Sequence, residues 1–362
     1  MSNTVQYRNL YAFHPGYYIG ELIAEMGVSP AEFARRMGTS RKTVSELLAG
    51  KCGLSRESAE KLSALTGMSI ECWLNIQKEY DVKLAEIERA QALDKQLDIL
   101  KDIDYSFFVK AVGLPRPRDL KTRVANLCKY LGIANLQRLK QEDLLVNYRA
   151  GVASMEEKNR VNASAWMLTA LNQARAMEVS PFSAEQLERS LPEVRSMTVQ
   201  PPEVFIPKLR GVFSDCGVAF VLLPTLKNSG INGAVKWYGA GRVMLALNDR
   251  RRYADTFWFA LFHEIKHVLQ QKIRTVFLSG RDLPDNQQLE AEADRFSADY
   301  LIPPEAYDSF LRGTYTTEGA IRDFALSINI HPGIVVGRLQ NDGKIPHTHF
   351  NHLREQYQIT QE

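Results

Sequence analysis

The stretch FALFHEIKHVLQ, residues 259–270, is the most informative part of this 362-residue chain. It places His263 and His267 four positions apart in an apolar segment, and in an α-helix such residues lie about 40° apart around the axis. Both can therefore bind one zinc ion, if a partner helix supplies a further ligand. Two satisfied core histidines are the alternative. A chance H-E-x-x-H match among seven histidines is expected on the order of once in a hundred chains.

A second helical stretch, LEAEADRFSADYLI, follows and carries acidic residues. Glu290 and Asp294 are four apart and share a face, so we predict Glu290 as the third zinc ligand and Asp294 as the acceptor that orients a ligand histidine. Glu292 is the alternative ligand. Glu264, beside the first histidine, is predicted to take the proton from a zinc-bound water during peptide hydrolysis.

The stretches FHEIKHVL and EAEADRFSADYLIPP resemble the ImmA/IrrE metallopeptidases, in which HE-x-x-H is followed by E-x-x-A-[ND]-x-F-A-x-x-L-L-x-P. The resemblance covers roughly residues 205–310. It implies a zinc-dependent protease that cuts a partner transcriptional repressor, with the same three ligands and the same base. Asp294 stands where Asn is common and Ser297 where Ala is common, and neither change removes a ligand.

A zinc peptidase also needs a hydrogen-bond donor for the oxyanion of the tetrahedral intermediate. Tyr300 and His331 are the candidates that the sequence offers. His331 precedes a proline in INIHPGIV, so a turn histidine is an equal alternative there.

The N-terminal stretch SPAEFARRMGTSRKTVSELLAGK predicts a helix-turn-helix. Ser29 is expected to cap the first helix, with Glu32 at the capping-box position, and Gly38 permits the turn. The start of the second helix enters the major groove in this motif. The predicted DNA-binding residues are Arg36, Ser40, Arg41, Lys42, Thr43 and Ser45. A small helical bundle for protein contacts is the alternative.

Residues 13–81 resemble the HigA-type antitoxins of the XRE superfamily nearly end to end, through the opening HPG, the loop GKCGLS and the closing WLNIQKEYD. The resemblance implies a homodimeric repressor that binds operator DNA and is sometimes paired with a toxin.

The expected fold is multidomain and mainly α, with a small α+β domain. It comprises an all-α helix-turn-helix bundle over 1–81, a helical middle region over 82–200, a zincin-like metallopeptidase domain over 201–310 and a helical tail over 311–362. GVAFVLLP predicts a strand and INGAVKWYGAGRVMLALND a hairpin. DVKLAEIERAQALDKQLDILKDI predicts one long amphipathic helix. SLPEVRSMTVQPPEVFIPK, with four prolines, predicts a boundary or linker.

Composition narrows the functional classes further. No apolar run is long enough for a bilayer, no secretory signal is visible, and the four cysteines form no CxxC pair, so we expect a cytoplasmic protein without membrane partners. The net charge of +3 is too small to indicate nucleic acid by itself.

Two functions therefore compete. The protein is a DNA-binding regulator whose zinc domain cuts a protein substrate: itself, a repressor or a partner toxin. Alternatively it is a non-enzymatic repressor or antitoxin whose peptidase-like domain senses a signal or binds a partner. The presence of Glu264 favours the first, because a structural zinc site needs no base.

Overall fold

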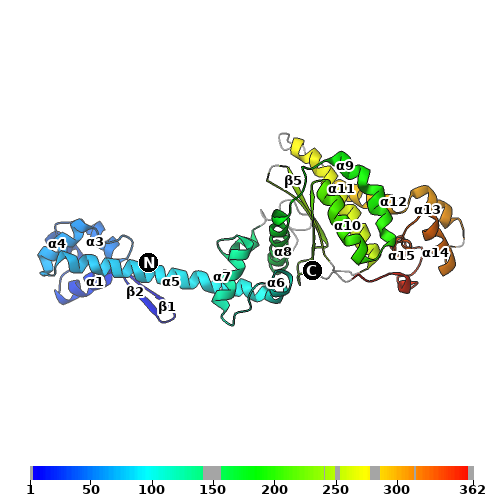
Figure 1. The fold of residues 1–362 in the computed structure, drawn as a ribbon. Helices are drawn as coiled ribbons and strands as arrows, with labels where there is room; N and C mark the ends of the chain where they lie inside the picture. The colour runs from blue at the N-terminus through cyan, green and yellow to red at the C-terminus, as the bar shows by residue number, and fades with distance from the viewer. Residues whose placement is uncertain are drawn as a thin grey trace. The chain divides into compact units, whose positions relative to one another are not determined.

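The computed structural model describes residues 3–141, 156–239, 241–248, 253–277, 286–313 and 315–357. The chain divides into two compact units, Met1–Asp98 and Ile99–Glu362, shown in Figure 1. Each unit has a hydrophobic core of its own.

The first unit consists of a short hairpin and a bundle of helices (Figure 1). Its elements are β1 (Thr4–Tyr7), β2 (Leu10–Phe13), α1 (Pro15–Glu25), α2 (Pro30–Arg36), α3 (Arg41–Leu48), α4 (Arg56–Thr66) and the long α5 (Ile70–Asp102). The antiparallel hairpin departs from the predicted all-α bundle. Two four-residue runs flank Arg8, whose φ of 55° turns the chain, and runs this short contain too little alternation to predict strands.

The helix-turn-helix prediction is confirmed in its local detail. The Ser29 hydroxyl accepts a hydrogen bond from the backbone N–H of Glu32 and so caps α2. The Ser40 hydroxyl caps α3 in the same way. Phe33 on α2 and Val44 on α3 are fully buried, so the apolar faces of the two helices join the core of the unit.

The second unit is built around a three-stranded sheet with helices on both faces. Its helices are α6 (Tyr105–Val112), α7 (Leu120–Leu131), α8 (Glu157–Ala176), α9 (Ala184–Ser196), α10 (Pro202–Asp215), α11 (Ala254–Phe277), α12 (Asn286–Leu301), α13 (Pro304–Leu311), α14 (Glu318–Ser327) and α15 (Pro332–Asn341). Its strands are β3 (Val218–Leu223), β4 (Gly233–Tyr238) and β5 (Arg242–Asn248).

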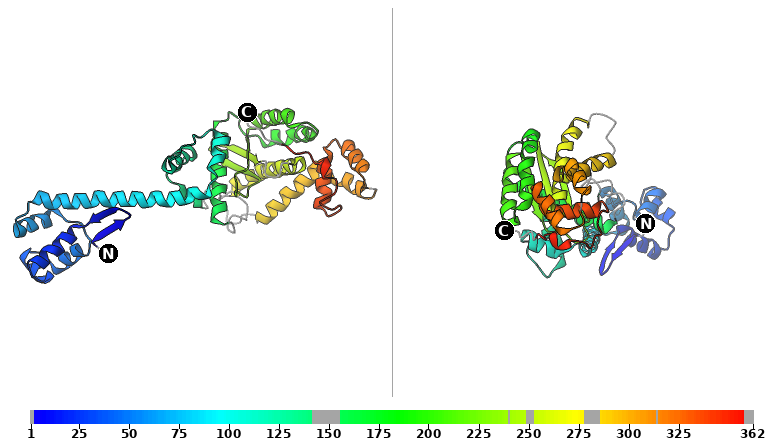
Figure 2. Two further views of the ribbon diagram at one scale, coloured as in Figure 1. Left: turned by 90° about the horizontal axis from the view of Figure 1, so that it is seen from below. Right: turned by 90° about the vertical axis from the view of Figure 1, so that its right-hand side faces the viewer.

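The sheet has the order β3-β5-β4, with β3 parallel and β4 antiparallel to β5. The predicted strand and hairpin are therefore confirmed. α8 packs on β3 and β5, while α10 and α11 pack against the sheet from the side of the main core. Figure 2 shows this arrangement from two further directions. The main core draws on residues from Leu187 to Tyr357, so the predicted segments 201–310 and 311–362 both contribute to it.

The predicted linker over SLPEVRSMTVQPPEVFIPK is wrong. Pro192 lies inside α9 and Pro207 inside α10, while Pro202 occupies the first turn of α10, where no backbone donor is missed. An internal proline removes one helical hydrogen bond. Here burial of the neighbouring apolar side chains in the main core offsets that loss; Leu191 and Phe205 are 4% and 0% exposed.

The predicted long amphipathic helix lies within α5, which begins earlier than expected, at Ile70. The stretch SGRDLPDNQQ, residues 279–288, also predicts a polar loop, and most of it lies outside the described residues. Among the helices described, none combines the length and the apolar character that crossing a bilayer requires.

Candidate functional site

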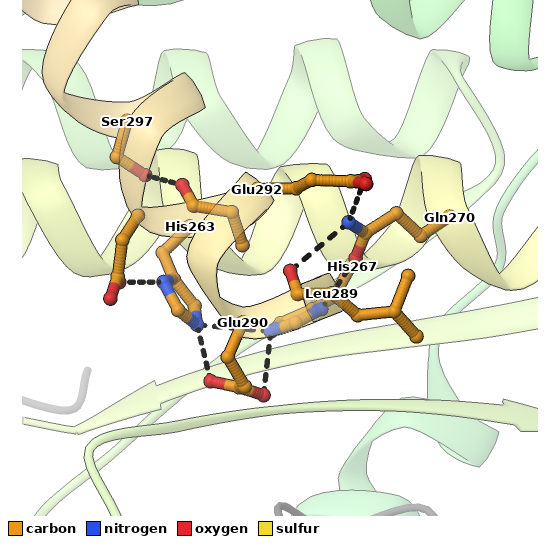
Figure 3. Close-up of polar contacts among 9 residues, drawn as sticks. His263, His267, Gln270, Leu289, Glu290, Glu292 and Ser297 are labelled. Atoms are coloured by element: carbon orange, nitrogen blue, oxygen red, sulfur yellow. Dashed lines mark hydrogen bonds and ion pairs between the residues drawn. The ribbon is translucent and has the colours of Figure 1, made fainter. Parts of the chain in front are cut away.

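The H-E-x-x-H motif lies on α11, whose apolar side packs on the sheet and on α12. His263 is 3% exposed, and both of its ring nitrogens contact carboxylates of α12, those of Glu290 and Asp294. The next helix therefore supplies the groups closest to the two histidines, as Figure 3 shows.

Three side chains converge at one point between α11 and α12 (Figure 3). The Nε2 atoms of His263 and His267 lie 2.9 Å apart. The carboxylate oxygens of Glu290 lie 3.4 Å from the first nitrogen and 3.2 Å from the second. Tetrahedral zinc with bonds of about 2.0–2.1 Å places neighbouring ligand atoms about 3.3 Å apart. The observed separations are close to that spacing.

The opposite ring nitrogens of the two histidines are held by acceptors. His263 Nδ1 lies 2.8 Å from a carboxylate oxygen of Asp294. His267 Nδ1 lies 2.9 Å from Oε1 of Gln270. The amide of Gln270 is oriented in turn, because its Nε2 donates to the Leu289 carbonyl at 3.1 Å and to the Glu292 carboxylate at 3.2 Å. Both Nδ1 atoms must therefore carry the proton and donate it.

The position of the proton on each imidazole determines which ligand can bind between the three side chains. Once Nδ1 carries the proton, a neutral imidazole has only a lone pair at Nε2. Two such lone pairs and a carboxylate then point at each other, and this set of acceptors is stabilised by a bound cation or by a proton on one of the imidazoles. The residues present fit a divalent metal, and two imidazoles with one carboxylate are a donor set that suits zinc.

Glu264 lies beside the first histidine and is 4% exposed. Its side chain packs against the start of β4, where Gly233 approaches it. The predicted base is therefore a buried carboxylate held between a helix and the sheet. Glu292, the alternative ligand, hydrogen bonds to Gln270 and Gln288 and is not part of the converging group.

The two predicted oxyanion donors are not brought to this group. Tyr300 stacks on Phe262 and packs against Phe296 with the two rings tilted by 35°, and burial raises the pKa of its hydroxyl. It follows Glu290 by ten residues, which is about 15 Å along a helix. His331 caps α15, where its Nδ1 accepts from the backbone N–H of Gly333. The turn role was the correct alternative for His331, and packing accounts for Tyr300.

Sequence reasoning missed Gln270, the residue that orients His267. The available signal was a polar side chain three positions after the second histidine, which places it on the same helix face as that histidine. Gln270 is 5% exposed, and a buried amide requires partners.

A cavity of about 640 Å³ adjoins the metal-ligand group and is bounded by α11, α12, α15 and the segment around Arg354. Asp294 and Phe259 line it, so it begins on the outer side of His263. Farther in, Arg354 forms a bidentate ion pair with Asp255, at 2.8 and 3.1 Å. The lining includes Asp294, which holds His263, but not the three converging side chains or Glu264.

The recognition helix of the first unit presents basic and hydroxyl side chains. Arg41, Lys42 and Ser45 are exposed, and Thr43 is half-buried with its hydroxyl 2.8 Å from that of Ser40. Arg36, on the preceding helix, is exposed and paired with a glutamate of its own helix. Lys42 lies 3.9 Å from a glutamate in an exposed pair, and such a pair contributes little. These side chains remain available to a ligand.

The first unit contains a helix-turn-helix with an exposed basic recognition helix. In the second unit, two histidines and a glutamate converge between two helices. These features define the protein's class: a DNA-binding module combined with a metallopeptidase-like domain. Comparison with known proteins gives the same two parts. Residues 19–71 match the Cro/C1-type HTH DNA-binding domain, and residues 221–329 match the IrrE N-terminal-like domain.

The curated relatives match about a fifth of the chain. The chain is 44% identical over 72 residues to the uncharacterized HTH-type transcriptional regulator YddM of Escherichia coli K12, a match that spans 20% of this chain and 77% of that protein. It is 37% identical over 70 residues to virulence-associated protein A' of Dichelobacter nodosus, spanning 19% of this chain and 61% of that protein. The chain therefore belongs to the Cro/C1-type helix-turn-helix family and carries an IrrE-like domain in its second unit.

Two solved structures are similar to about a quarter of the chain. One is an addiction module antidote protein of the HigA family from Coxiella burnetii, 26% identical with a TM-score of 0.22, covering 23% of this chain and 92% of that one. The other is a Pseudomonas aeruginosa protein in complex with its operator DNA, 28% identical with a TM-score of 0.22, covering 23% of this chain and 90% of that one.

Proposed function

We propose that this protein is an operator-binding regulator whose IrrE-like domain is a zinc-dependent endopeptidase that cuts a regulatory protein. The observation that carries the proposal is the convergence of two imidazoles and the Glu290 carboxylate, together with a buried glutamate, Glu264, on the residue that follows the first of these histidines. A purely structural metal site has no use for that additional carboxylate. The substrate is a repressor, a partner toxin or the chain itself.

Each residue has a distinct task in this proposal. His263, His267 and Glu290 hold the zinc, which when bound supplies the Lewis acidity that activates water and polarises the scissile carbonyl. Glu264 takes the proton from the attacking water at a carboxylate oxygen and delivers it to the leaving amine nitrogen. Asp294 and Gln270 keep the two imidazoles in the tautomer that turns Nε2 toward the ion.

The test of the enzymatic half is Glu264→Gln in the full-length protein. We expect the variant to bind one zinc like the wild type and to lose proteolysis of co-encoded operon proteins, measured by metal analysis and by mass spectrometry of fragments. Glu290→Gln is the matched control on the facing helix, and it should lose the metal itself. A wild type that stays zinc-free after reconstitution would refute the site, and continued cleavage by Glu264→Gln would refute the base.

The test of the DNA half is the double variant Arg41→Ala with Lys42→Ala. For each phosphate that the protein no longer neutralises, the slope of log affinity against log salt should become shallower by about 0.9, so affinity for the promoter region of its own gene should fall most at low salt. Arg56→Ala, which removes an exposed arginine outside the recognition helix, is the control. Unchanged affinity of the double variant would show that another surface reads DNA.

One observation favours the non-enzymatic alternative. Glu264 and His263 are only 4% and 3% exposed, so a peptide must reach an almost covered base. A domain that senses a metal or binds a partner needs no such access. If the Glu264→Gln variant regulates its promoter like the wild type in cells that retain the partner, sensing or partner binding is the function, and the covered base is incidental.

A further inference from the structure

Gly233 is the first residue of β4, where it pairs with Leu247 of β5. Its φ is not in the left-handed region that favours glycine. A glycine inside a strand weakens it and often marks a place where another group comes close. The backbone conformation of residue 233 therefore does not require a glycine, and the contacts around the residue must explain it.

The space that a side chain would need at residue 233 is already filled. A Cβ built there would lie 2.8 Å from both Cγ and Oε1 of Glu264, and 2.8 Å from Cδ2 of Leu247. Non-bonded carbon atoms prefer separations of about 3.5–4.0 Å. Any side chain at this position must therefore displace Glu264, Leu247 or the strand.

Glu264 has little room to retreat. It is 4% exposed, and its helix packs on both β4 and β5. The neighbouring residue, His263, is tied to Asp294 on α12. A displaced Glu264 side chain must therefore change its own rotamer, and its carboxylate then moves relative to the metal-ligand group.

We propose that Gly233 is the positioning residue for Glu264: the bare backbone at the start of β4 leaves the volume in which the carboxylate stands beside the metal. The inference rests on the proposed function, since it concerns the same site. Relieving a 2.8 Å contact requires a shift of roughly 0.7–1.2 Å. Misplacement of a reacting group by about 1 Å can reduce the rate on the order of a hundredfold.

The kinetic test compares Gly233→Ala with the wild type on a synthetic mixed-sequence peptide library. Cut bonds are identified by mass spectrometry, and one cut sequence is resynthesised to measure kcat and KM. We expect kcat to fall by roughly ten- to a hundredfold, with KM and zinc content unchanged. Wild-type kcat in Gly233→Ala would overturn the proposal.

Two glycine-to-alanine controls separate positioning from general damage. Gly211 lies exposed on α10 with nothing near its absent Cβ, so Gly211→Ala should leave kcat unchanged. Gly333 on α15 has an equally tight contact, 2.8 Å to the Leu353 carbonyl oxygen. Gly333→Ala should lower the melting temperature while the folded protein keeps its kcat. If it loses kcat as Gly233→Ala does, the effect is not specific to Glu264.

A stability cycle tests the contact without any assay of activity. The loss of melting temperature caused by Gly233→Ala is measured in the wild type and in the Glu264→Ala background, where Cγ and Oε1 are absent. A smaller loss in that background supports the proposal. An equal loss would mean that Leu247 alone requires the glycine. If the wild type cuts no peptide in the library, the proposed peptidase function fails, while this cycle still decides whether Gly233 and Glu264 compete for one volume.

Discussion

At the scale of single residues, the metal-ligand group is defined by hydrogen bonds behind the ligands. A histidine on a helix can place either ring nitrogen toward an ion, and the hydrogen bond made by the other nitrogen fixes which one it is. Asp294 accepts this hydrogen bond from His263, and Gln270 accepts it from His267. The two acceptors differ, because one is an anion on the facing helix and the other a neutral amide on the same helix.

Removal of either acceptor should weaken metal binding. For Asp294→Ala and for Gln270→Ala, we expect zinc affinity to fall by about 10–100-fold, because the imidazole is then free to rotate or to change tautomer. Competition with a chromogenic chelator measures the affinity. Asp299→Ala, farther along α12, is the control and should bind zinc like the wild type. Unchanged affinity in Gln270→Ala would show that the helix alone orients His267.

At the scale of elements, two helices begin with the same tripeptide. His14 caps α1 and His331 caps α15, and in each case the ring Nδ1 accepts from the backbone N–H of the glycine two positions later. A proline follows each histidine at the first helical position, where its missing N–H costs nothing. Burial lowers the pKa of both histidines. The caps therefore require neutral imidazoles.

The cap at His14 predicts a pH-dependent stability of the first unit. The folded-state pKa lies below the ordinary value of about 6.5, so the unfolded chain binds the proton more readily. The stabilisation is fully present above about pH 6.5 and is lost as the pH falls toward the folded-state pKa. Hydrogen exchange of α1 amides, corrected for intrinsic rates, should show protection declining over that range.

The variant His14→Asn tests the assignment, because an asparagine can accept the same backbone hydrogen bond but does not titrate. His14 is the only histidine among residues 1–98, so this variant should flatten the decline between about pH 6.5 and the acid range where carboxylates titrate. A decline of the same size in His14→Asn would assign the pH dependence to other groups.

At the scale of the whole molecule, the two units have separate cores and separate candidate sites. The metal ligands lie in the second unit and the recognition helix in the first. Metal binding to the folded state alone stabilises it by RT ln(1 + [L]/Kd), which is about 2.7 kcal/mol when free zinc is about a hundred times Kd.

Metal removal should therefore act on one unit only. After chelation we expect the second unit to unfold at a lower temperature, measured by hydrogen exchange of the α11 amides. The protection of the α3 amides, which report on the first unit, should stay unchanged. Affinity for the promoter DNA, measured with and without zinc at equal salt, should stay the same. A change in DNA affinity on chelation would reveal coupling between the units.

Much of this protein could be read from local patterns. Helical and strand periods fix which side chains share a face. Residue spacing therefore predicts the caps at Ser29 and Ser40, the strand and hairpin of the small sheet, and the shared helix face of Glu290 and Asp294. Packing accounts for the errors. The proline-rich stretch forms helices because its apolar residues are buried in the main core. Tyr300 packs against aromatic side chains and is not part of the metal-ligand group.

Both classes of site were already specified by the amino-acid order, since the H-E-x-x-H spacing and the helix-turn-helix pattern are local properties of the chain. How the histidines are held and where the base lies depend instead on the folded arrangement. Gln270 orients His267 because Leu289 and Glu292 on another helix fix its amide, and Gly233 meets Glu264 only because a strand packs on a helix. Contacts between residues far apart in the chain depend on packing, and no sequence period records them.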